Sequence, residues 1–395
     1  MSADAATALA RGTVTIDTEA ELKKKLASGR SLRIKLGVDP TLSDLTVGHA
    51  VPLRKLRQFQ DLGHTAVLII GDYTACVGDP SGRNKTRPQP THEEVLGYAE
   101  TYVEQARKIL DPDKMEVAYN GSWFADMNFL DVIRLASRTT VARLLERDDF
   151  SKRYKSEMPI AVHEFLYPLM QAYDSVQVKA DVELGATDQT FNLLLGRDLM
   201  RQEGLEPQVC MTVPILVGLD GEKKMSKSLG NYIGLNDPPE EMYGKAMSIP
   251  DRCMEDYFIL CTSVPADEVA TRIAGDPRET KGFLASELVR LYHGEDAAKG
   301  AEEHFNRVFR DRKEPESIEE VTIDPASLED GAIWIVKLLV ESGLAAKNNE
   351  ARRKIEGGGV TYADEKITDP KANITVVDGA VLKAGKRHFR RTRLG

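Results

Sequence analysis

Cysteine is scarce in this chain of 395 residues, and its four copies do not group. Cys76, Cys210, Cys253 and Cys261 form no CxxC pair and no cluster with histidines. Structural zinc sites and disulfide frameworks depend on closely spaced or paired cysteines, so the sequence argues against both. Such a chain fits a reducing compartment, and we expect a cytoplasmic protein.

Long apolar runs are also absent from the sequence. No stretch reaches the roughly 18 apolar residues of a membrane span. The first 26 residues, MSADAATALARGTVTIDTEAELKKKL, lack the basic start and apolar stretch of a secretory signal. Hydrophobic residues make up 42% and charged residues 29%, a profile of soluble globular proteins. We therefore expect no membrane partner, and the length suits two or three domains.

Positive charge is unevenly distributed along the chain. The formal net charge is −9, yet residues 331–395 hold 13 Lys and Arg against 7 Asp and Glu. An acidic body with a basic tail suits a polyanionic partner that docks on the tail. A solvated basic face would give the same charge count, and charge alone does not decide between the two interpretations.

Strand and helix patterns alternate near the start of the chain. RIKLGVDP, residues 33–40, predicts a strand that ends in a turn, and residues 47–62 have the spacing of an amphipathic helix. TAVLIIGD, residues 65–72, is a continuous apolar run typical of a buried parallel strand. This order favours an α/β fold with a Rossmann-like parallel sheet.

The composition then predicts how the rest of the chain is divided. We expect an α/β domain over 1–236 with a helical insertion at about 86–176, an all-helical domain over 237–313, an acidic proline-containing linker over 314–330 and a small α+β domain over 331–395.

The first candidate site lies where the first expected strand ends. GVDPT, residues 37–41, is followed by TVGH, residues 46–49, which opens a helix. Glycine at a strand end lets a ligand approach the backbone, and a helix N-terminus offers free N–H groups to phosphate. His49 could donate to phosphate oxygens, although a lone histidine of this kind is often structural.

A lysine-rich loop, EKKMSKS at residues 222–228, forms the second candidate site. Mobile lysines flanked by hydroxyl residues suit a loop that closes on a triphosphate and stabilises charge on leaving pyrophosphate. A solvated lysine-rich turn is the alternative. The pentapeptide KMSKS, about 175 residues after TVGH, argues against that alternative.

A polar stripe marks a third candidate site. Tyr167, Gln171 and Asp174 lie at i, i+4 and i+7, so they share one face of an expected helix. Polar groups on an otherwise apolar helix are costly to bury without partners. The stripe is therefore either a structural hydrogen-bond network or part of a pocket for an amphoteric ligand.

In combination these motifs resemble those of class I aminoacyl-tRNA synthetases, in which GxDPT with xGH and KMSKS bind ATP. GDPSG at 78–82, YPLMQAYD at 167–174 and GATDQ at 185–189 are similar to stretches of the bacterial-type tyrosyl enzymes. The resemblance covers nearly the whole chain. It implies that L-tyrosine is activated with ATP to tyrosyl-adenylate and pyrophosphate, and then transferred to the 3′ end of tRNA(Tyr).

The resemblance also implies roles for individual residues. The catalytic residues would be Thr46, His49, Lys224 and Lys227. ATP and the adenylate would contact Gly37, Asp39, Thr41, Gly48, Gly185, Asp188, Met225, Ser226 and Ser228. Tyrosine would contact Asp79, Tyr167, Gln171, Asp174 and Gln189, with Asp174 accepting a hydrogen bond from the phenolic hydroxyl.

Three positions depart from the family's pattern. Thr46 stands where most members have the first histidine of their motif, although threonine can still donate one hydrogen bond to phosphate. Lys35 replaces a tyrosine that touches the substrate hydroxyl in one branch, and we assign it no substrate role. Ala186 replaces a usual glycine.

The segment NNEARRKIEGGGV, residues 348–360, is similar to the RNA-binding domain named after small-subunit ribosomal protein four. This second resemblance implies that a basic face holds RNA phosphates, and the resemblance to the tyrosyl enzymes implies that the helical domain lies on the anticodon side. The residues expected to bind RNA are Arg352, Arg353, Lys354, Lys386 and Arg387.

The implied partners are tyrosine, ATP, tRNA(Tyr) and a second copy of the chain in a homodimer. Mg²⁺ would travel with ATP, and no dedicated protein metal site is expected. Two alternatives stay open at this point. One is a tryptophanyl enzyme, which shares the fold and the lysine loop, and the other is a non-catalytic paralogue that only binds RNA.

Overall fold

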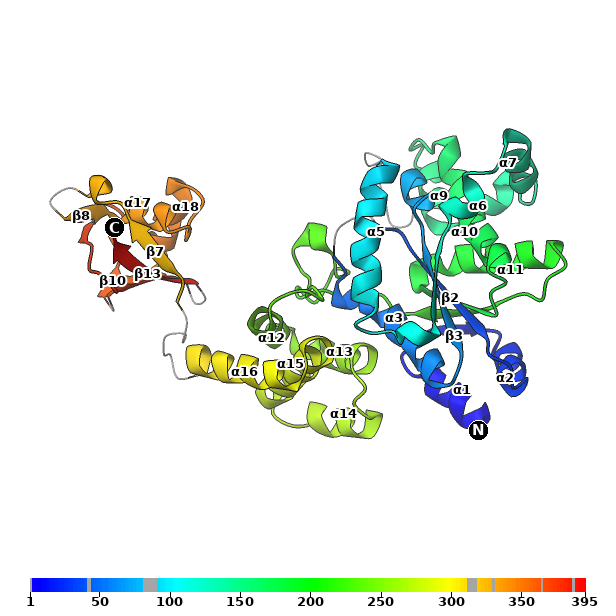
Figure 1. Ribbon diagram of the computed structural model, residues 1–395, viewed down its shortest axis with the longest axis horizontal. Coiled ribbons are helices and arrows are strands. Elements are labelled where there is room, and N and C mark those ends of the chain that lie inside the picture. The colour runs from blue at the N-terminus through cyan, green and yellow to red at the C-terminus, as the bar shows by residue number, and fades with distance from the viewer. Residues whose placement is uncertain are drawn as a thin grey trace. The chain divides into compact units, whose positions relative to one another are not determined.

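The computed structural model describes residues 2–40, 44–80, 91–310, 318–328, 331–363, 365–385 and 388–395. It divides the chain into two compact units, Met1–Ala298 and Lys299–Gly395. Both are drawn in Figure 1, which colours the chain from blue to red along the sequence. Within the described ranges, no helix combines the length and the apolar character needed to cross a membrane.

A six-stranded sheet forms the centre of the N-terminal unit (Figure 1). Its strand order is β1-β6-β5-β2-β3-β4; the five strands from β6 to β4 run parallel, and β1 pairs antiparallel with β6. The strands are β1 (Thr15–Asp17), β2 (Arg33–Val38), β3 (Thr65–Ile70), β4 (Met115–Tyr119), β5 (Val182–Ala186) and β6 (Val209–Val213). All five residues of β6 are buried, as expected for a parallel strand covered on both faces. The α/β fold predicted from the sequence is confirmed.

Helices connect the parallel strands. On α3, the apolar residues that predicted an amphipathic helix, Leu53, Leu56 and Phe59, are almost fully buried, and the helix packs on β2, β3 and β5. The apolar spacing predicted this helix because the apolar side chains form the face that packs on the sheet. The helices of this layer and of the N-terminus are α1 (Ser2–Ala10), α2 (Glu19–Ala27), α3 (Val47–Asp61), α4 (Thr74–Val77), α5 (His92–Ala106) and α11 (Thr190–Gln202).

The helical insertion starts later than the expected position near residue 86. Strand β4 lies inside the expected range and pairs in parallel with β3, so the chain returns to the sheet before the insertion begins. The expectation was wrong here because β4 is short and its pattern is interrupted by Glu116. The helices after β4 are α6 (Gly121–Phe124), α7 (Phe129–Ala136), α8 (Val141–Leu144), α9 (Asp148–Lys155) and α10 (Leu166–Gln177).

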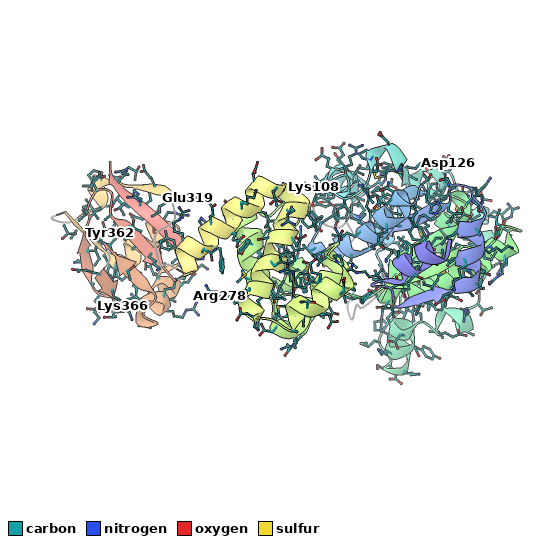
Figure 2. All side chains as sticks on the ribbon, turned by 90° about the horizontal axis from the view of Figure 1, so that it is seen from below. Lys108, Asp126, Arg278, Glu319, Tyr362 and Lys366 are labelled. Carbon is teal, nitrogen blue, oxygen red and sulfur yellow. The ribbon has the colours of Figure 1, made fainter. Side chains whose placement is uncertain are left out.

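The stretch after the sheet is helical, as predicted. Helix α12 packs against α15, and α13 packs against α3, which joins these helices to the sheet within one compact unit. Lys108, labelled in Figure 2, donates to Asn236 Oδ1 over 2.7 Å and links the end of the α5 region to the segment before α12. The helices are α12 (Pro239–Met247), α13 (Met254–Cys261), α14 (Ala266–Ile273), α15 (Pro277–His293) and α16 (Glu295–Phe305).

Among its described residues, the C-terminal unit combines α17 and α18 with a five-stranded sheet of order β10-β9-β12-β13-β7 and a two-stranded sheet of β11 and β8. Tyr362, labelled in Figure 2, is buried and shares a hydrogen bond with Thr392 over 3.1 Å. The elements are β7 (Glu320–Ile323), β8 (Ala332–Trp334), α17 (Ile335–Glu341), α18 (Asn348–Glu356), β9 (Val360–Tyr362), β10 (Glu365–Ile367), β11 (Asn373–Thr375), β12 (Val381–Ala384) and β13 (His388–Leu394).

The expectation of a linker over 314–330 was wrong for part of that range, because strand β7 lies within it. This strand pairs in parallel with β13, and Ile323 is buried in the core of the C-terminal unit. Residues 318–328 are therefore part of that unit, although their acidic, proline-containing composition suggested a spacer. The rest of the expected linker lies outside the described residues, as do residues 311–313 at the end of the expected helical domain.

Candidate active site

A cleft of about 330 Å³ lies where β2 and β5 end, at the carboxyl edge of the parallel sheet. Open α/β sheets bind their ligands at this edge. Ten of the residues predicted from the sequence line the cleft: Gly37, Asp39, His49, Asp79, Tyr167, Gln171, Asp174, Gly185, Asp188 and Gln189. Thr41 lies outside the described residues. The structure thus brings together residues that are up to about 150 positions apart in the sequence.

The end of β2 leaves the backbone open to a ligand. A Cβ built on Gly37 would have no other atom within 4 Å, whereas a Cβ on Gly71 would lie 2.0 Å from Asp39 Oδ1. Glycine at 71 therefore lets the Asp39 carboxylate rest against bare backbone. Thr74 and Tyr167 each donate a hydroxyl hydrogen bond to Asp39 over 2.8 Å, which fixes both carboxylate oxygens.

Asp174 lies at the buried wall of the cleft, where it is 4% exposed. The Trp123 indole donates to its Oδ1 over 3.0 Å and the Asn120 amide to its Oδ2 over 3.4 Å. Burial raises the pKa of Asp174 to about 7, although Lys35 and these two donors oppose that shift. Asn120 and Trp123 were not predicted from the sequence, because they follow β4, a short strand without a clear sequence pattern.

Five polar side chains form a continuous network beside the cleft. Gln189 donates to Asp79 Oδ2 over 2.9 Å, and the Asn192 amide donates to Gln189 Oε1 over 3.1 Å and to Gln171 Oε1 over 2.8 Å. Arg147 donates to the remaining oxygen of Asp79 over 3.0 Å. Asn192 and Arg147 were not singled out in the sequence, and each lies outside the recognisable motifs.

Lys35 belongs to a buried ion pair behind this network. Its ammonium group donates to Glu183 Oε1 over 2.8 Å, to Ser175 Oγ over 2.6 Å and to the Gln171 carbonyl over 2.8 Å. The side chains of Lys35 and Glu183 are at most 1% exposed. A buried charge needs such partners. Lys35 is absent from the lining of the cleft, which fits a structural role.

His49 is held by the residue that opens its helix. The Thr46 N–H donates to His49 Nδ1 over 3.1 Å, and the Thr46 hydroxyl lies 2.8 Å from the same nitrogen. Because a backbone N–H can only donate, Nδ1 is the acceptor, and the neutral ring carries its proton on Nε2. Desolvation of the ring, with Lys227 and Lys224 nearby, lowers the pKa of His49 to about 4, although the residue as a whole keeps a solvent-exposed surface. Thr46 itself is 0% exposed, so its hydroxyl serves the histidine.

The lysine loop is anchored at its centre and at its end. Met225 is buried, and its sulfur accepts from the Gly48 N–H over 3.3 Å, which joins the loop to the start of α3. The Ser226 N–H donates to Asn231 Oδ1 over 2.9 Å. Lys227 pairs with Asp44 over 3.1 Å. Lys224 is exposed, and the hydroxyls of Ser226 and Ser228 lie 2.9 Å apart.

The basic residues expected to bind RNA differ in their exposure and in their contacts with other side chains. Arg352 and Arg353 are exposed on α18, and the Arg352 guanidinium lies 5.5 Å from the centre of the Trp334 ring. Lys354 instead donates to the Leu344 carbonyl over 2.6 Å and pairs with Glu350 over 2.8 Å. Lys386 and Arg387 lie outside the described residues.

The family profile of class I tRNA synthetases (W and Y) matches residues 27–310, which include the whole cleft. The chain belongs to this family of class I tRNA synthetases. The letters denote tryptophan and tyrosine, so the profile alone leaves both types of synthetase open.

Individual relatives of this chain identify the tyrosine branch of the class I synthetases. The tyrosine–tRNA ligase of Thermotoga maritima is 53% identical over 389 residues, which cover 97% of this chain and 96% of that protein. The enzyme of the same name from Moorella thermoacetica is 51% identical over 381 residues, 95% of this chain and 91% of the relative. The chain is thus a bacterial-type tyrosyl member, and the tryptophanyl and non-catalytic alternatives are not favoured.

Solved structures agree with the synthetase fold. A tyrosyl-tRNA synthetase from Archaeoglobus fulgidus, complexed with L-tyrosine, has a TM-score of 0.65 and 24% identity, and covers 76% of this chain and 100% of its own. A truncated mitochondrial tyrosyl-tRNA synthetase from Aspergillus nidulans has a TM-score of 0.64 at 24% identity and covers 76% of this chain and 92% of its own. At this identity the likeness supports the fold alone.

Proposed function

We propose that the cleft of the N-terminal unit binds tyrosine with its phenol ring towards Asp174, and that this contact selects the amino acid. The observation that carries the proposal is a buried carboxyl group at the cleft wall, held from behind by Trp123 and Asn120. A phenolic hydroxyl completes its hydrogen bonding, whereas phenylalanine leaves a buried polar group without a partner. Tyrosyl-tRNA synthetase is a known case of strong rejection of phenylalanine on this basis.

The other end of tyrosine fits the polar network. Asp79 offers a carboxylate to the α-ammonium group, and Tyr167 and Gln171 complete that side of the cleft. Gln189 lies between Asp79 and Asn192, where it can contact the bound amino acid. This orientation places the tyrosine carboxylate towards the end of β2, where Gly37 leaves room for a phosphate.

ATP would bind across the end of β2 and the start of α3. Gly37, Asp39, Gly48, Gly185 and Asp188 would contact the α-phosphate and ribose, and Thr41 stays a further candidate from the sequence. The proton on His49 Nε2 is available to a phosphate oxygen, and Thr46 acts by orienting that ring. Met225, Ser226 and Ser228 would hold the lysine loop against the nucleotide.

The reaction requires no covalent intermediate on the protein. A tyrosine carboxylate oxygen forms a bond to the α-phosphorus of ATP, and the bond from that phosphorus to the bridging oxygen of pyrophosphate breaks. Lys224 and Lys227 would stabilise the charge that develops on the leaving pyrophosphate. The ribose hydroxyl at the 3′ end of tRNA(Tyr) then attacks the carbonyl carbon, and AMP leaves. Mg²⁺ would enter with ATP and neutralise part of the phosphate charge.

The tRNA would be held by the C-terminal unit, through Arg352 and Arg353 and through the more constrained Lys354, with Lys386 and Arg387 as further candidates. A homodimer is supported by the exposed apolar side chains of the insertion, such as Phe129 at 80% and Val162 at 81% exposure. Because tRNA charging serves protein synthesis, the cytoplasm is the compartment that fits this activity.

Pyrophosphate exchange tests the proposal directly. The parent protein should exchange label between pyrophosphate and ATP with tyrosine, and far less with phenylalanine or tryptophan. Asp174→Ala should strongly impair the exchange that depends on tyrosine. Circular dichroism and thermal unfolding show whether the variant is folded. Unchanged tyrosine activation by a folded Asp174→Ala protein would reject the assignment of the phenol site.

A further inference from the structure

Arg147 is a buried cation placed next to a site that should receive another cation. It lies between α8 and α9 in the helical insertion, and its side chain is 4% exposed. Its guanidinium donates to Asp79 Oδ1 over 3.0 Å and to Asn192 Oδ1 over 3.2 Å, and its Nε forms an ion pair with Asp149 Oδ1 at 2.9 Å. A guanidinium can form such a fork of bonds, whereas an ammonium group cannot match its planar geometry.

The first consequence of these contacts concerns the Asp79 carboxylate. Asp79 follows Gly78, which ends α4 with a positive φ of 83°, so it is on a turn and outside any helix or strand. Arg147 holds one oxygen and Gln189 holds the other, over 3.0 and 2.9 Å. The two bonds fix the plane of the carboxylate. Asp79 lines the cleft, so a ligand bound there meets a carboxylate whose orientation is already set.

The second consequence concerns the direction of the amide groups. Arginine can only donate, so Asn192 must present its oxygen to Arg147 and its NH₂ to Gln171 and Gln189. Gln171 and Gln189 accept through their oxygens, and their NH₂ groups therefore point to Glu183 and Asp79. Because Arg147 can only donate and the carboxylates of Glu183 and Asp79 can only accept, the three amide groups between them have one consistent orientation.

We propose that Arg147 is a positioning residue for the tyrosine ammonium site, through its bonds to Asp79 and Asn192. It contacts no reacting atom, and it acts by fixing the groups that do contact the substrate. The two carboxylates beside it, Asp79 and Asp149, leave the cluster one negative charge in excess, which the substrate ammonium balances. This inference rests on the proposed function of Asp79.

Two tyrosine analogues test the proposal by inhibition of tyrosine-dependent pyrophosphate exchange. Tyramine keeps the phenol and the ammonium group, whereas 3-(4-hydroxyphenyl)propanoate keeps the phenol and the carboxylate. In Arg147→Gln the inhibition constant of tyramine should rise about tenfold or more, because Asp79 loses the bond that holds its carboxylate in the orientation that the ammonium group needs, and this loss outweighs the removal of a nearby positive charge. The constant for the propanoate should change by less than about twofold. The KM of tyrosine should rise more than kcat falls.

A general loss of structure would instead weaken both analogues equally. Arg143→Gln is the matched control, since Arg143 is in the same insertion, pairs with Glu146 and lies over the Phe191 ring without touching Asp79. It should leave the ratio of the two inhibition constants unchanged. If Arg147→Gln does not fold, Arg147→Lys carries the same test, because lysine keeps the charge but not the fork. An unchanged ratio in the folded variant overturns the proposal.

Asp79→Asn separates this inference from the function on which it rests. If Asp79→Asn leaves the ratio unchanged, the ammonium assignment itself fails. If Asp79→Asn shifts the ratio and Arg147→Gln does not, only the role of Arg147 fails. In the double variant the shift should be smaller than the sum of the two single shifts, since both changes act on one contact.

Discussion

The carboxyl group of Asp174 is buried, where its ionisation costs free energy. Its pKa is raised to about 7 by burial, whereas an ordinary aspartate has a value of 3.8. Between these two pH values the folded protein holds a proton that the unfolded chain has released. The free energy of unfolding therefore falls as pH rises from about 4 to about 7, and this term is constant above that range.

Asp174→Asn removes this titration and should therefore abolish the pH dependence that Asp174 causes. Relative to the parent, the variant should gain free energy of unfolding as pH rises from about 4 to about 7, by up to about 4 kcal/mol. Urea unfolding of both proteins at pH 5, 6, 7 and 8, without tyrosine, measures the difference. A difference that does not vary with pH would show that Asp174 has an ordinary pKa in the folded state.

At the scale of single residues, the sequence indicated the side chains that belong to recognisable motifs. Gly37, Asp39 and His49 were predictable because strand ends and helix starts have their own patterns. Arg147 was not, because it lies in the charged run ERDDF, where a buried arginine looks like a solvated one. Asn192 has no local signal at all, since its role depends on side chains from three other elements.

The lysine loop is the element whose charge should matter most for the first step. Loss of one transition-state contact typically costs about 3–4 kcal/mol. Lys227→Ala should therefore lower the pre-steady-state rate of adenylate formation by about two orders of magnitude or more, with the tyrosine dissociation constant little changed. Stopped-flow fluorescence can follow both quantities.

Lys223→Ala is the matched control for the lysine loop. Lys223 carries the same charge two residues before Met225, and it is exposed. Its loss should change the rate of adenylate formation far less than that of Lys227. A Lys227→Ala protein that binds tyrosine more weakly but forms adenylate at the normal rate would contradict the role given to the loop.

At the scale of elements, the long and strongly periodic segments were predictable, and the short strands were not. Helix α3 has a buried apolar face, and β3 is a continuous apolar run, so each pattern identifies its structure. Strands β4 and β7 have only five and four residues; Glu116 lies within β4, and Glu320 is the first residue of β7. Pairing with β3 and β13 decides their conformation, and such non-local pairing is not visible in a local sequence pattern.

At the scale of the whole molecule, the apolar surface of the insertion should be covered by a second copy. Side chains such as Phe129, Tyr154 and Val162 are 80%, 66% and 81% exposed, respectively. Light scattering at micromolar concentration should report twice the chain mass of 43.8 kDa. Phe129→Asp combined with Val162→Asp should shift the protein towards monomer, because charges are costly in an apolar interface. Leu62→Asp, an exposed apolar position outside the insertion, should leave the mass unchanged, and a monomeric parent protein would reject the dimer.

The two units of the chain should separate the two steps of the reaction. All residues of the cleft precede Ala298, and the excess positive charge lies after Gly331. The family profile also ends at residue 310. A chain truncated after Arg310 should therefore keep tyrosine-dependent pyrophosphate exchange close to the full-length rate. It should lose most tRNA charging, because each lost phosphate contact removes affinity.

The double change Arg352→Gln with Arg353→Gln should weaken tRNA binding in the full-length chain in the same direction. Each arginine that contacts a phosphate contributes about 0.7–0.9 to the slope of log affinity against log salt, so the slope should become shallower by one to two. Lys366→Gln is a suitable control, since Lys366 is an exposed cation of the same unit on another element, β10.

The truncated chain is tested by comparing its pyrophosphate exchange with its aminoacylation. Equal retention of both activities would mean that tRNA is anchored outside the C-terminal unit, and equal loss would mean that this unit is needed for the catalytic fold.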